Sequence, residues 1–253
     1  MSFRLPQLSA DPQTRFPSPE IALAEPDGLL AFGGDLSPQR LLNAYRSGIF
    51  PWYSDDEPIL WWSPSQRAVF RTDAVHLPKR VRSSLRDSNW IVRMDTAFEE
   101  VIAACATAPR AGQAGTWITS AMQRAYIALH RLGHAHSVEV FDGSAVDGGR
   151  LVGGLYGLAV GRMFCGESMY SAESGASTAA LAALARHLHA HGWPLIDAQV
   201  PNAHTQRLGV ETWTRRDYLH ALAALRDCDA ATGTFADGFG NYPASVLACT
   251  PLP

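Results

Sequence analysis

The stretch that decides the fold of this chain is RMFCGESMY (residues 162–170), an apolar run that carries Glu167 where a core residue is expected. A second stretch, WPLIDAQV (residues 193–200), has the same character and carries Asp197. Both are short, hydrophobic and preceded by glycine, which predicts two buried strands. An isolated buried carboxylate costs several kcal/mol or shifts its pKa. We expect at least one of the two to be functional, although carboxylates that only bind backbone N–H groups are common.

The order of the predicted elements around these strands indicates a mixed α/β fold. Helices are predicted over residues 78–86, 96–106, 119–132, 177–191 and 216–226, and strands over residues 69–72, 90–94, 137–141 and 150–158. The turn Asp147-Gly148-Gly149 joins the last two strands, and the tail after Asp227 is expected to be irregular. A helix, several consecutive strands, a helix and a strand form an order compatible with an acetyltransferase-type fold.

Residues 1–66 differ from the rest of the chain because they are rich in Pro, Gly and Trp. One helix is legible there, with Ser37 as its N-cap, Pro38 in its first turn and Gly48 after its end. Dense glycine-rich turns flanked by aromatic residues predict a compact lobe with an aromatic surface. We therefore expect a small N-terminal lobe over residues 1–66 and a larger domain over residues 67–253.

The composition of the 253 residues, 47% hydrophobic and 18% charged, is typical of a globular protein with an ample core. No apolar run reaches membrane-spanning length, and the first residues lack a signal-peptide pattern, so we expect a cytoplasmic location without membrane contact. Four widely separated cysteines without a C-x-x-C pair favour neither a zinc site nor a disulfide framework.

Positive charge gathers in one segment although the formal net charge of the chain is −3. Between Arg67 and Arg93 the sequence has seven basic residues and two acidic ones. Such a segment is compatible with a nucleic-acid contact, but by itself it favours a solvated surface.

No motif in the sequence predicts a cofactor. The run GGLYG (residues 153–157) lacks the spacing and the strand-to-helix turn of a dinucleotide fingerprint. The pyrophosphate loop of acetyltransferases is missing before the helix that begins near Ser177, so acetyl-coenzyme A is not the expected donor. The alternating His187, His189 and His191 near a helix end are not expected to bind a metal.

Asp197 and Gln199 are two residues apart on the predicted second strand, so their side chains should share a face. In one interpretation the carboxylate holds or polarises the amide, which orients an amine or a carbonyl. In the other, Asp197 caps a nearby turn and Gln199 binds backbone. The residues alone leave both open.

Several long motifs make the chain resemble the leucyl/phenylalanyl-tRNA–protein transferase family. They are EPDGLLAFGGDLSP (residues 25–38), AYRSGIFPWYS (44–54), ILWWSP (59–64), GTWIT (115–119), GHAHSVE (133–139), FCGESM (164–169), LIDAQ (195–199) and RR (215–216). Together they span roughly residues 15–220. Two positions depart from the family pattern: Thr178 stands where lysine is usual, and Arg207 where serine is usual.

The resemblance implies an enzyme that transfers leucine or phenylalanine, and less readily methionine, from aminoacyl-tRNA to an N-terminal Arg or Lys of acceptor proteins. The transfer marks these proteins for degradation by the N-end rule. It also implies a small N-terminal lobe on an acetyltransferase-like catalytic domain, in agreement with the boundary near residue 66, and no cofactor.

The resemblance also implies roles for individual residues. Asp197 and Gln199 belong to the reaction centre, where they position and deprotonate the acceptor amine, and Glu167 binds the aminoacyl α-amino group or the terminal adenosine. The aminoacyl side-chain pocket is formed by Leu155, Phe164, Met169, Leu181, Leu184, Leu188 and Ile196. The residues expected to stack on the tRNA 3′ adenosine are Tyr45, Trp52, Trp117 and Tyr126. The residues expected to contact tRNA phosphates are Arg67, Lys79, Arg80, Arg82 and Arg86.

Overall fold

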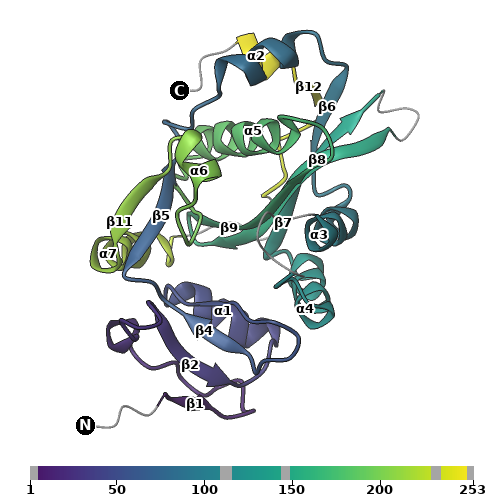
Figure 1. Cartoon of the computed structure of the whole chain (residues 1–253). Helices are drawn as coiled ribbons and strands as arrows, with labels where there is room; N and C mark the ends of the chain where they lie inside the picture. Colours follow the sequence, from purple (N-terminus) through teal and green to yellow (C-terminus); the bar gives the residue numbers. More distant parts are fainter. Residues whose placement is uncertain (1–4, 109–115, 144–148, 229–234, 250–253) are drawn as a thin grey trace.

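The computed structural model describes residues 5–108, 116–143, 149–228 and 235–249, in which helices pack against two β-sheets (Figure 1). The predicted mixed α/β class is confirmed. The predicted turn at Asp147 and Gly148 lies outside the described residues.

The large sheet has the strand order β11-β5-β10-β9-β8-β7-β6-β12 in the described residues. Its strands are β5 (Gln66–Arg71), β6 (Trp90–Met94), β7 (Ala135–Asp142), β8 (Arg150–Val160), β9 (Met163–Ser171), β10 (Leu195–Asp197), β11 (Glu211–Thr214) and β12 (Tyr242–Pro243). Within this described sheet β9 and β10 run parallel, and the other neighbours run antiparallel.

The two strands predicted from the opening motifs are therefore neighbours, and they separate in the middle of the sheet. Their ladder ends where Asp197 pairs with Cys165, whereas β9 continues to Ser171. The prediction that the second strand extends to residue 200 is wrong. Gln199 has a φ of +54°, in the left-handed region, so the extended backbone stops before it.

Helices cover both faces of the large sheet. They are α2 (Lys79–Arg86), α3 (Phe98–Thr107), α4 (Ser120–Arg131), α5 (Ala176–Ala190), α6 (Ala203–Arg207), α7 (Arg215–Leu225) and α8 (Val246–Cys249). One buried cluster contains residues of α5 and α8, and another contains residues of α3 and α4, which lie across the sheet from α5 (Figure 1). The predicted order of helix, three strands, helix and strand corresponds to α4, β7, β8, β9, α5 and β10. The short α6, β11, β12 and α8 were not predicted.

The small sheet has the order β1-β2-β4-β3 and carries α1. These elements are β1 (Gln7–Leu8), β2 (Leu29–Gly33), β3 (Phe50–Pro51), β4 (Leu60–Trp62), α1 (Pro38–Arg46) and the 3-10 helix η1 (Pro19–Ile21). The predicted cap is confirmed, because the Ser37 hydroxyl accepts the Arg40 N–H at 3.4 Å. We call residues 5–65, which contain this sheet and α1, the N-terminal lobe.

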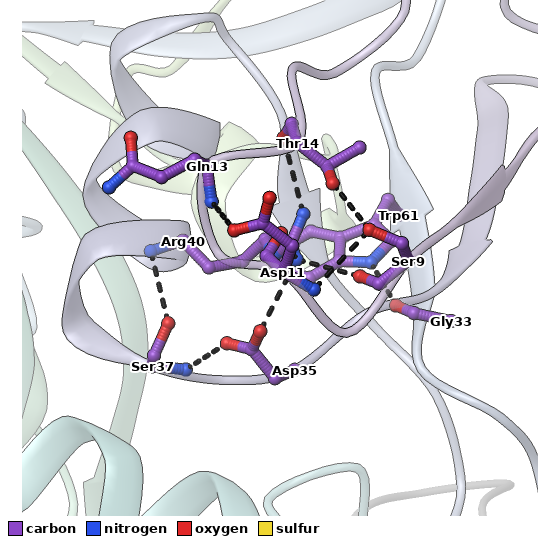
Figure 2. Close-up of polar contacts among 9 residues, drawn as sticks. All are labelled: Ser9, Asp11, Gln13, Thr14, Gly33, Asp35, Ser37, Arg40 and Trp61. Atoms are coloured by element: carbon purple, nitrogen blue, oxygen red, sulfur yellow. Dashed lines mark hydrogen bonds and ion pairs between the residues drawn. The ribbon is translucent and has the colours of Figure 1, made fainter.

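A buried arginine ties the first residues of this lobe to α1 (Figure 2). The Arg40 side chain, 0% exposed, donates to the backbone oxygens of Ser9, Asp11 and Thr14 and to the carboxylate of Asp35. The guanidinium thus satisfies carbonyl groups of a segment that has little regular structure.

One apolar cluster joins the lobe to the large sheet. It contains Leu41 and Trp61 of the lobe together with Phe98, Tyr126 and Leu158. Helix α1 lies between the two sheets and contacts α4 and β8 (Figure 1). The domain boundary near residue 66 stays a prediction.

Candidate active site

A cavity of about 240 Å³ opens where β9 and β10 separate. Its wall is formed by Phe70, Trp117, Leu155, Tyr156, Phe164, Gly166, Glu167, Ser168, Met169, Leu181, Leu184, Ile196, Ala198, Gln199, Asn202, His204 and Thr205. Six of the seven predicted pocket residues are in this wall. The seventh, Leu188, is buried one turn further along α5 and is not among the lining residues.

Glu167 is the carboxylate on the cavity wall, and uncharged groups hold it. The Tyr126 hydroxyl donates to Oε2 at 2.9 Å, and the Gln199 amide Nε2 donates to Oε1 at 3.0 Å. The Tyr45 hydroxyl is hydrogen-bonded to that of Tyr126. Burial raises the pKa of Glu167 to about 7, against the hydrogen bonds from the tyrosines, which lower it. The group is therefore poised to take up or release a proton near neutral pH.

Asp197 has the opposite environment, because it is fully buried behind the wall and bound to a cation. Arg67 Nε donates to Oδ1 at 2.8 Å and Nη2 donates to Oδ2 at 2.6 Å, a bidentate ion pair. The Tyr218 hydroxyl also donates to Oδ2, at 2.9 Å. Asp197 is not among the residues that line the cavity.

The Asp197 side chain contacts the backbone of Gln199. The Gln199 N–H donates to Asp197 Oδ1 at 2.9 Å, and the Gln199 side chain extends to Glu167. The expectation that both side chains share one strand face is therefore wrong, because the strand ends at Asp197. The alternative that Asp197 caps a turn is confirmed, although the amide of Gln199 binds a carboxylate instead of backbone.

Arg67, predicted to contact tRNA phosphates, is 1% exposed and has no surface for such a contact. Its guanidinium carbon lies over the rings of Phe50 and Tyr218, at 4.8 and 4.4 Å from their centroids. Burial lowers the pKa of a guanidinium, but the charge of Asp197 outweighs this effect and holds the pKa of Arg67 above its usual value. A sequence signal for this role exists, since Arg67 directly precedes the apolar run Ala68-Val69-Phe70.

The other predicted phosphate ligands, Lys79, Arg80, Arg82 and Arg86, are exposed on α2. This helix packs on α5 and α8 (Figure 1).

The four aromatic residues predicted at the adenosine fall into two pairs. Tyr45 and Tyr126 are buried, so they have no face on which a base can stack, and their hydroxyls point toward Glu167. Trp52 is 39% exposed and lies in a groove of about 840 Å³ that also includes Trp62. Trp117 lines both the groove and the cavity, so it joins the two.

Within the described residues, no group of three His, Cys, Asp or Glu side chains could hold a metal ion. Of the helices that the structure describes, none has the length and apolarity needed to cross a membrane. The four cysteines, all within the described residues, form no disulfide. Of the two departures from the family pattern, Thr178 is buried in α5, whereas Arg207 is exposed on α6.

An apolar cavity with a carboxylate of raised pKa on its wall, in a mixed α/β fold, can hold a small apolar group beside a proton acceptor. Comparison with known proteins identifies the family. The model of the leucyl/phenylalanyl-tRNA protein transferase family matches residues 69–223, and the model of its N-terminal domain matches residues 34–65. The chain belongs to this family and is an aminoacyltransferase.

Individual relatives match along almost the whole chain. The leucyl/phenylalanyl-tRNA–protein transferase of Xanthomonas axonopodis pv. citri (strain 306) is 61% identical over 95% of this chain and 94% of that protein. The enzyme of the same name from Xanthomonas euvesicatoria pv. vesicatoria (strain 85-10) is 60% identical over 99% and 98%. Among solved structures, FemX matches with a TM-score of 0.44 and 12% identity over 70% of this chain and 66% of that one, a similarity too low for a functional argument.

Proposed function

We propose that this chain transfers leucine or phenylalanine, and less readily methionine, from aminoacyl-tRNA to the α-amino group of an N-terminal Arg or Lys of acceptor proteins in the cytoplasm. The transfer marks those proteins for degradation by the N-end rule. The observation that carries the proposal is the apolar cavity with Glu167 on its wall, in a chain that is 61% identical to an enzyme of this name.

The cavity fits the side chain of the transferred amino acid. Its volume of about 240 Å³ and its lining by Leu155, Phe164, Leu181 and Leu184 suit a leucyl or phenylalanyl group and disfavour a charged one. Methionine differs from leucine by little apolar surface, and such differences in a hydrophobic pocket are worth only ~1–3 kcal/mol. The pocket should therefore accept methionine less readily without excluding it.

In the reaction, the nitrogen of the acceptor amine forms a bond to the aminoacyl carbonyl carbon, and the bond from that carbon to the ribose oxygen of the tRNA breaks. The acceptor ammonium group must first lose one proton, because only the neutral amine has the electron pair that attacks the carbonyl carbon. Glu167, with a pKa of about 7, is matched to an α-amino group, whose pKa is about 8. We assign Glu167 to contact the amine and accept this proton. After the attack the nitrogen loses a second proton, and the ribose oxygen takes up one proton as it leaves.

Gln199 and Asp197 have separate tasks in this assignment. The Gln199 amide holds Glu167 and presents its remaining polar atoms to the substrate. Asp197 fixes the backbone of Gln199 and does not touch the substrate, because the Arg67 and Tyr218 donors and its burial close it off.

The tRNA contacts divide between two regions. Trp52 and Trp117 offer ring surface for the 3′ adenosine beside the cavity mouth. Lys79, Arg80, Arg82 and Arg86 supply exposed positive charge on α2 for backbone phosphates. Tyr45 and Tyr126 serve the site by holding Glu167.

The direct test is to incubate the chain with leucyl-tRNA and a peptide that begins with Arg, and to detect the leucylated peptide by mass spectrometry. A matched peptide that begins with Glu serves as the acceptor control. We expect leucine on the Arg peptide alone. Absence of transfer from both leucyl- and phenylalanyl-tRNA would refute the proposed function, and equal transfer to both peptides would refute the acceptor preference.

A further inference from the structure

A buried cation stands directly behind the reaction centre. All three guanidinium nitrogens of Arg67 have partners: Nε and Nη2 bind the Asp197 carboxylate, and Nη1 donates to the Gly48 backbone oxygen at 3.2 Å. The rings of Phe50 and Tyr218 pack against the guanidinium, with centroids 4.8 and 4.4 Å from its central carbon. Because the planar guanidinium forms fixed, directional bonds, this environment holds the Asp197 carboxylate in one orientation.

Tyr218 adds a second restraint from a different element. It is 1% exposed on α7, and its hydroxyl donates to Asp197 Oδ2 at 2.9 Å while accepting from Arg67 Nη2 at 3.3 Å. Asp197 is thus held from β5 through Arg67 and from α7 through Tyr218.

The orientation of Asp197 determines the position of Gln199. Asp197 Oδ1 accepts the Gln199 N–H, and Gln199 has a φ of +54°, a conformation that residues other than glycine rarely adopt. This turn sends the Gln199 side chain to the Oε1 atom of Glu167. A continuous chain of contacts therefore runs from Arg67 and Tyr218 through Asp197 and Gln199 to the carboxylate on the cavity wall.

The N-terminal lobe makes hydrogen bonds at both ends of this series of contacts. Gly48, which accepts from Arg67, follows the end of α1, and Tyr45 near the end of α1 reaches Glu167 through Tyr126. A Cβ atom on Gly48 would lie 2.5 Å from Leu219 and 3.1 Å from Tyr218. The lobe therefore packs directly on the helix that carries Tyr218.

We propose that Arg67 and Tyr218 are positioning residues for aminoacyl transfer, which set the turn at residues 197–199 and so hold the Gln199 amide against Glu167. This inference rests on the proposed function for its chemistry, and it goes beyond it by assigning two residues that do not touch the substrate. The same contacts make the geometry of the site depend on the docking of the lobe through Gly48.

The test compares Tyr218→Phe, which keeps the ring over Arg67 and removes the hydroxyl, with Arg40→Lys in the lobe. Arg40 is as deeply buried as Arg67, but its guanidinium binds the first residues of the lobe (Figure 2). We expect Tyr218→Phe to lower kcat about tenfold with KM for both substrates within about twofold, because one hydrogen bond to a charged group is lost. Arg40→Lys should lower Tm and leave kcat within about twofold.

A second readout separates positioning from stability. When Gln199 no longer donates firmly to Glu167, the charged form of that carboxylate loses a partner and its pKa rises. The acidic limb of the pH profile of kcat should then move to higher pH in Tyr218→Phe and stay in place in Arg40→Lys. A ¹³C NMR titration of the Glu167 carboxyl without substrate should show the same displacement, and it does not require activity.

The outcomes are distinct for the two proposals. No leucyl or phenylalanyl transfer by the wild-type chain would refute the proposed function, whatever the variants do. A wild-type kcat together with an unmoved Glu167 titration in Tyr218→Phe would overturn the positioning role. So would a loss of kcat in Arg40→Lys equal to that in Tyr218→Phe at equal Tm. Arg67→Lys, which keeps the charge and loses the bidentate geometry, should lower kcat more than Tyr218→Phe does.

Discussion

The surroundings of Glu167 and of Asp197 differ sharply, although both carboxylates come from neighbouring strands and are bridged by one residue, Gln199. Asp197 is fully buried and neutralised by Arg67, whereas Glu167 is half-buried, lines the cavity, and forms no ion pair among the described residues. A buried carboxylate in a bidentate ion pair fixes structure. One held by hydroxyl and amide groups can exchange its proton near neutral pH.

The largest expected effect is that of Glu167→Gln on the transfer rate. The amide keeps the shape of the side chain but cannot accept the amine proton, and general base catalysis contributes roughly 10²–10⁴-fold. Single-turnover transfer at pH 7.5 should fall within that range with little change in KM. Because the change removes a partly desolvated charge, Tm should not fall. A rate within threefold of wild type would remove Glu167 from the chemistry.

Asp197→Asn should lower the stability of the fold, which Glu167→Gln should not, in addition to any loss of rate through Gln199. It leaves the buried Arg67 charge without its anion, and breaking a buried ion pair in this way costs about 3–5 kcal/mol. Urea unfolding should show a free energy of unfolding lower by about this amount, in contrast to the unchanged or higher value for Glu167→Gln. Equal stabilities of the two variants would contradict the assignment of structural and catalytic carboxylates.

The pH dependence of stability should distinguish the two carboxylates further. Because the pKa of Glu167 is raised in the folded state from 4.5 to about 7, the folded state binds its proton more strongly than the unfolded state does. The contribution of protonated Glu167 to the free energy of unfolding is therefore fully present below about pH 4.5, and it is lost as the pH rises through about 7. Relative to wild type, Glu167→Gln should gain stability between these pH values, by an amount on the order of 3 kcal/mol.

The control for this comparison is the buried Glu139. Burial also raises its pKa to about 7, against hydrogen bonds from Ser137 and Thr96, so it adds a similar dependence to both proteins. Only the difference in Tm between wild type and variant, followed from pH 4.5 to 8, reports on Glu167. A constant difference would contradict the raised pKa of Glu167.

The smallest expected effect is that of Tyr126→Phe, which removes one donor from Glu167 and leaves Asp197 untouched. The loss of a hydrogen bond to the charged form raises the pKa of Glu167, by about one unit for a bond of ~1.4 kcal/mol. The rate should fall severalfold at pH 6 and change little at pH 8.5. A uniform loss at all pH values would instead indicate that Tyr126 contacts the substrate.

Much of this site could be predicted from the sequence. Short apolar runs predict the two buried carboxylates and the mixed α/β order, and the motif resemblance predicts six of the seven pocket residues. The limit is visible at Gln199: the alternation in LIDAQV continues past Asp197, but the backbone turns there, where the Gln199 N–H donates a hydrogen bond to the Asp197 side chain. Periodicity records burial along one element and carries no information about such a contact.

The wrong predictions for individual residues also concern contacts between distant segments. The sequence groups Arg67 with the surface arginines of the basic segment, because it does not show which cation pairs with a buried anion from a distant strand. Tyr45 and Tyr126 were placed at a base because an aromatic side chain has both a ring face and a hydroxyl, and only packing decides which of them is available. The short α6 and β11 lack the apolar period by which longer elements are found.

The ion pair behind the site also has a consequence for synthesis of the chain. Arg67 precedes Asp197 by 130 residues and Tyr218 by 151. At ~5–20 residues per second, a ribosome needs roughly 6–26 s to add the residues that separate the arginine from its anion. Until then the guanidinium must remain in water. The reaction centre is therefore among the last parts of the molecule to assemble, and a nascent chain that ends before residue 197 has no site with which to act on aminoacyl-tRNA beside the ribosome.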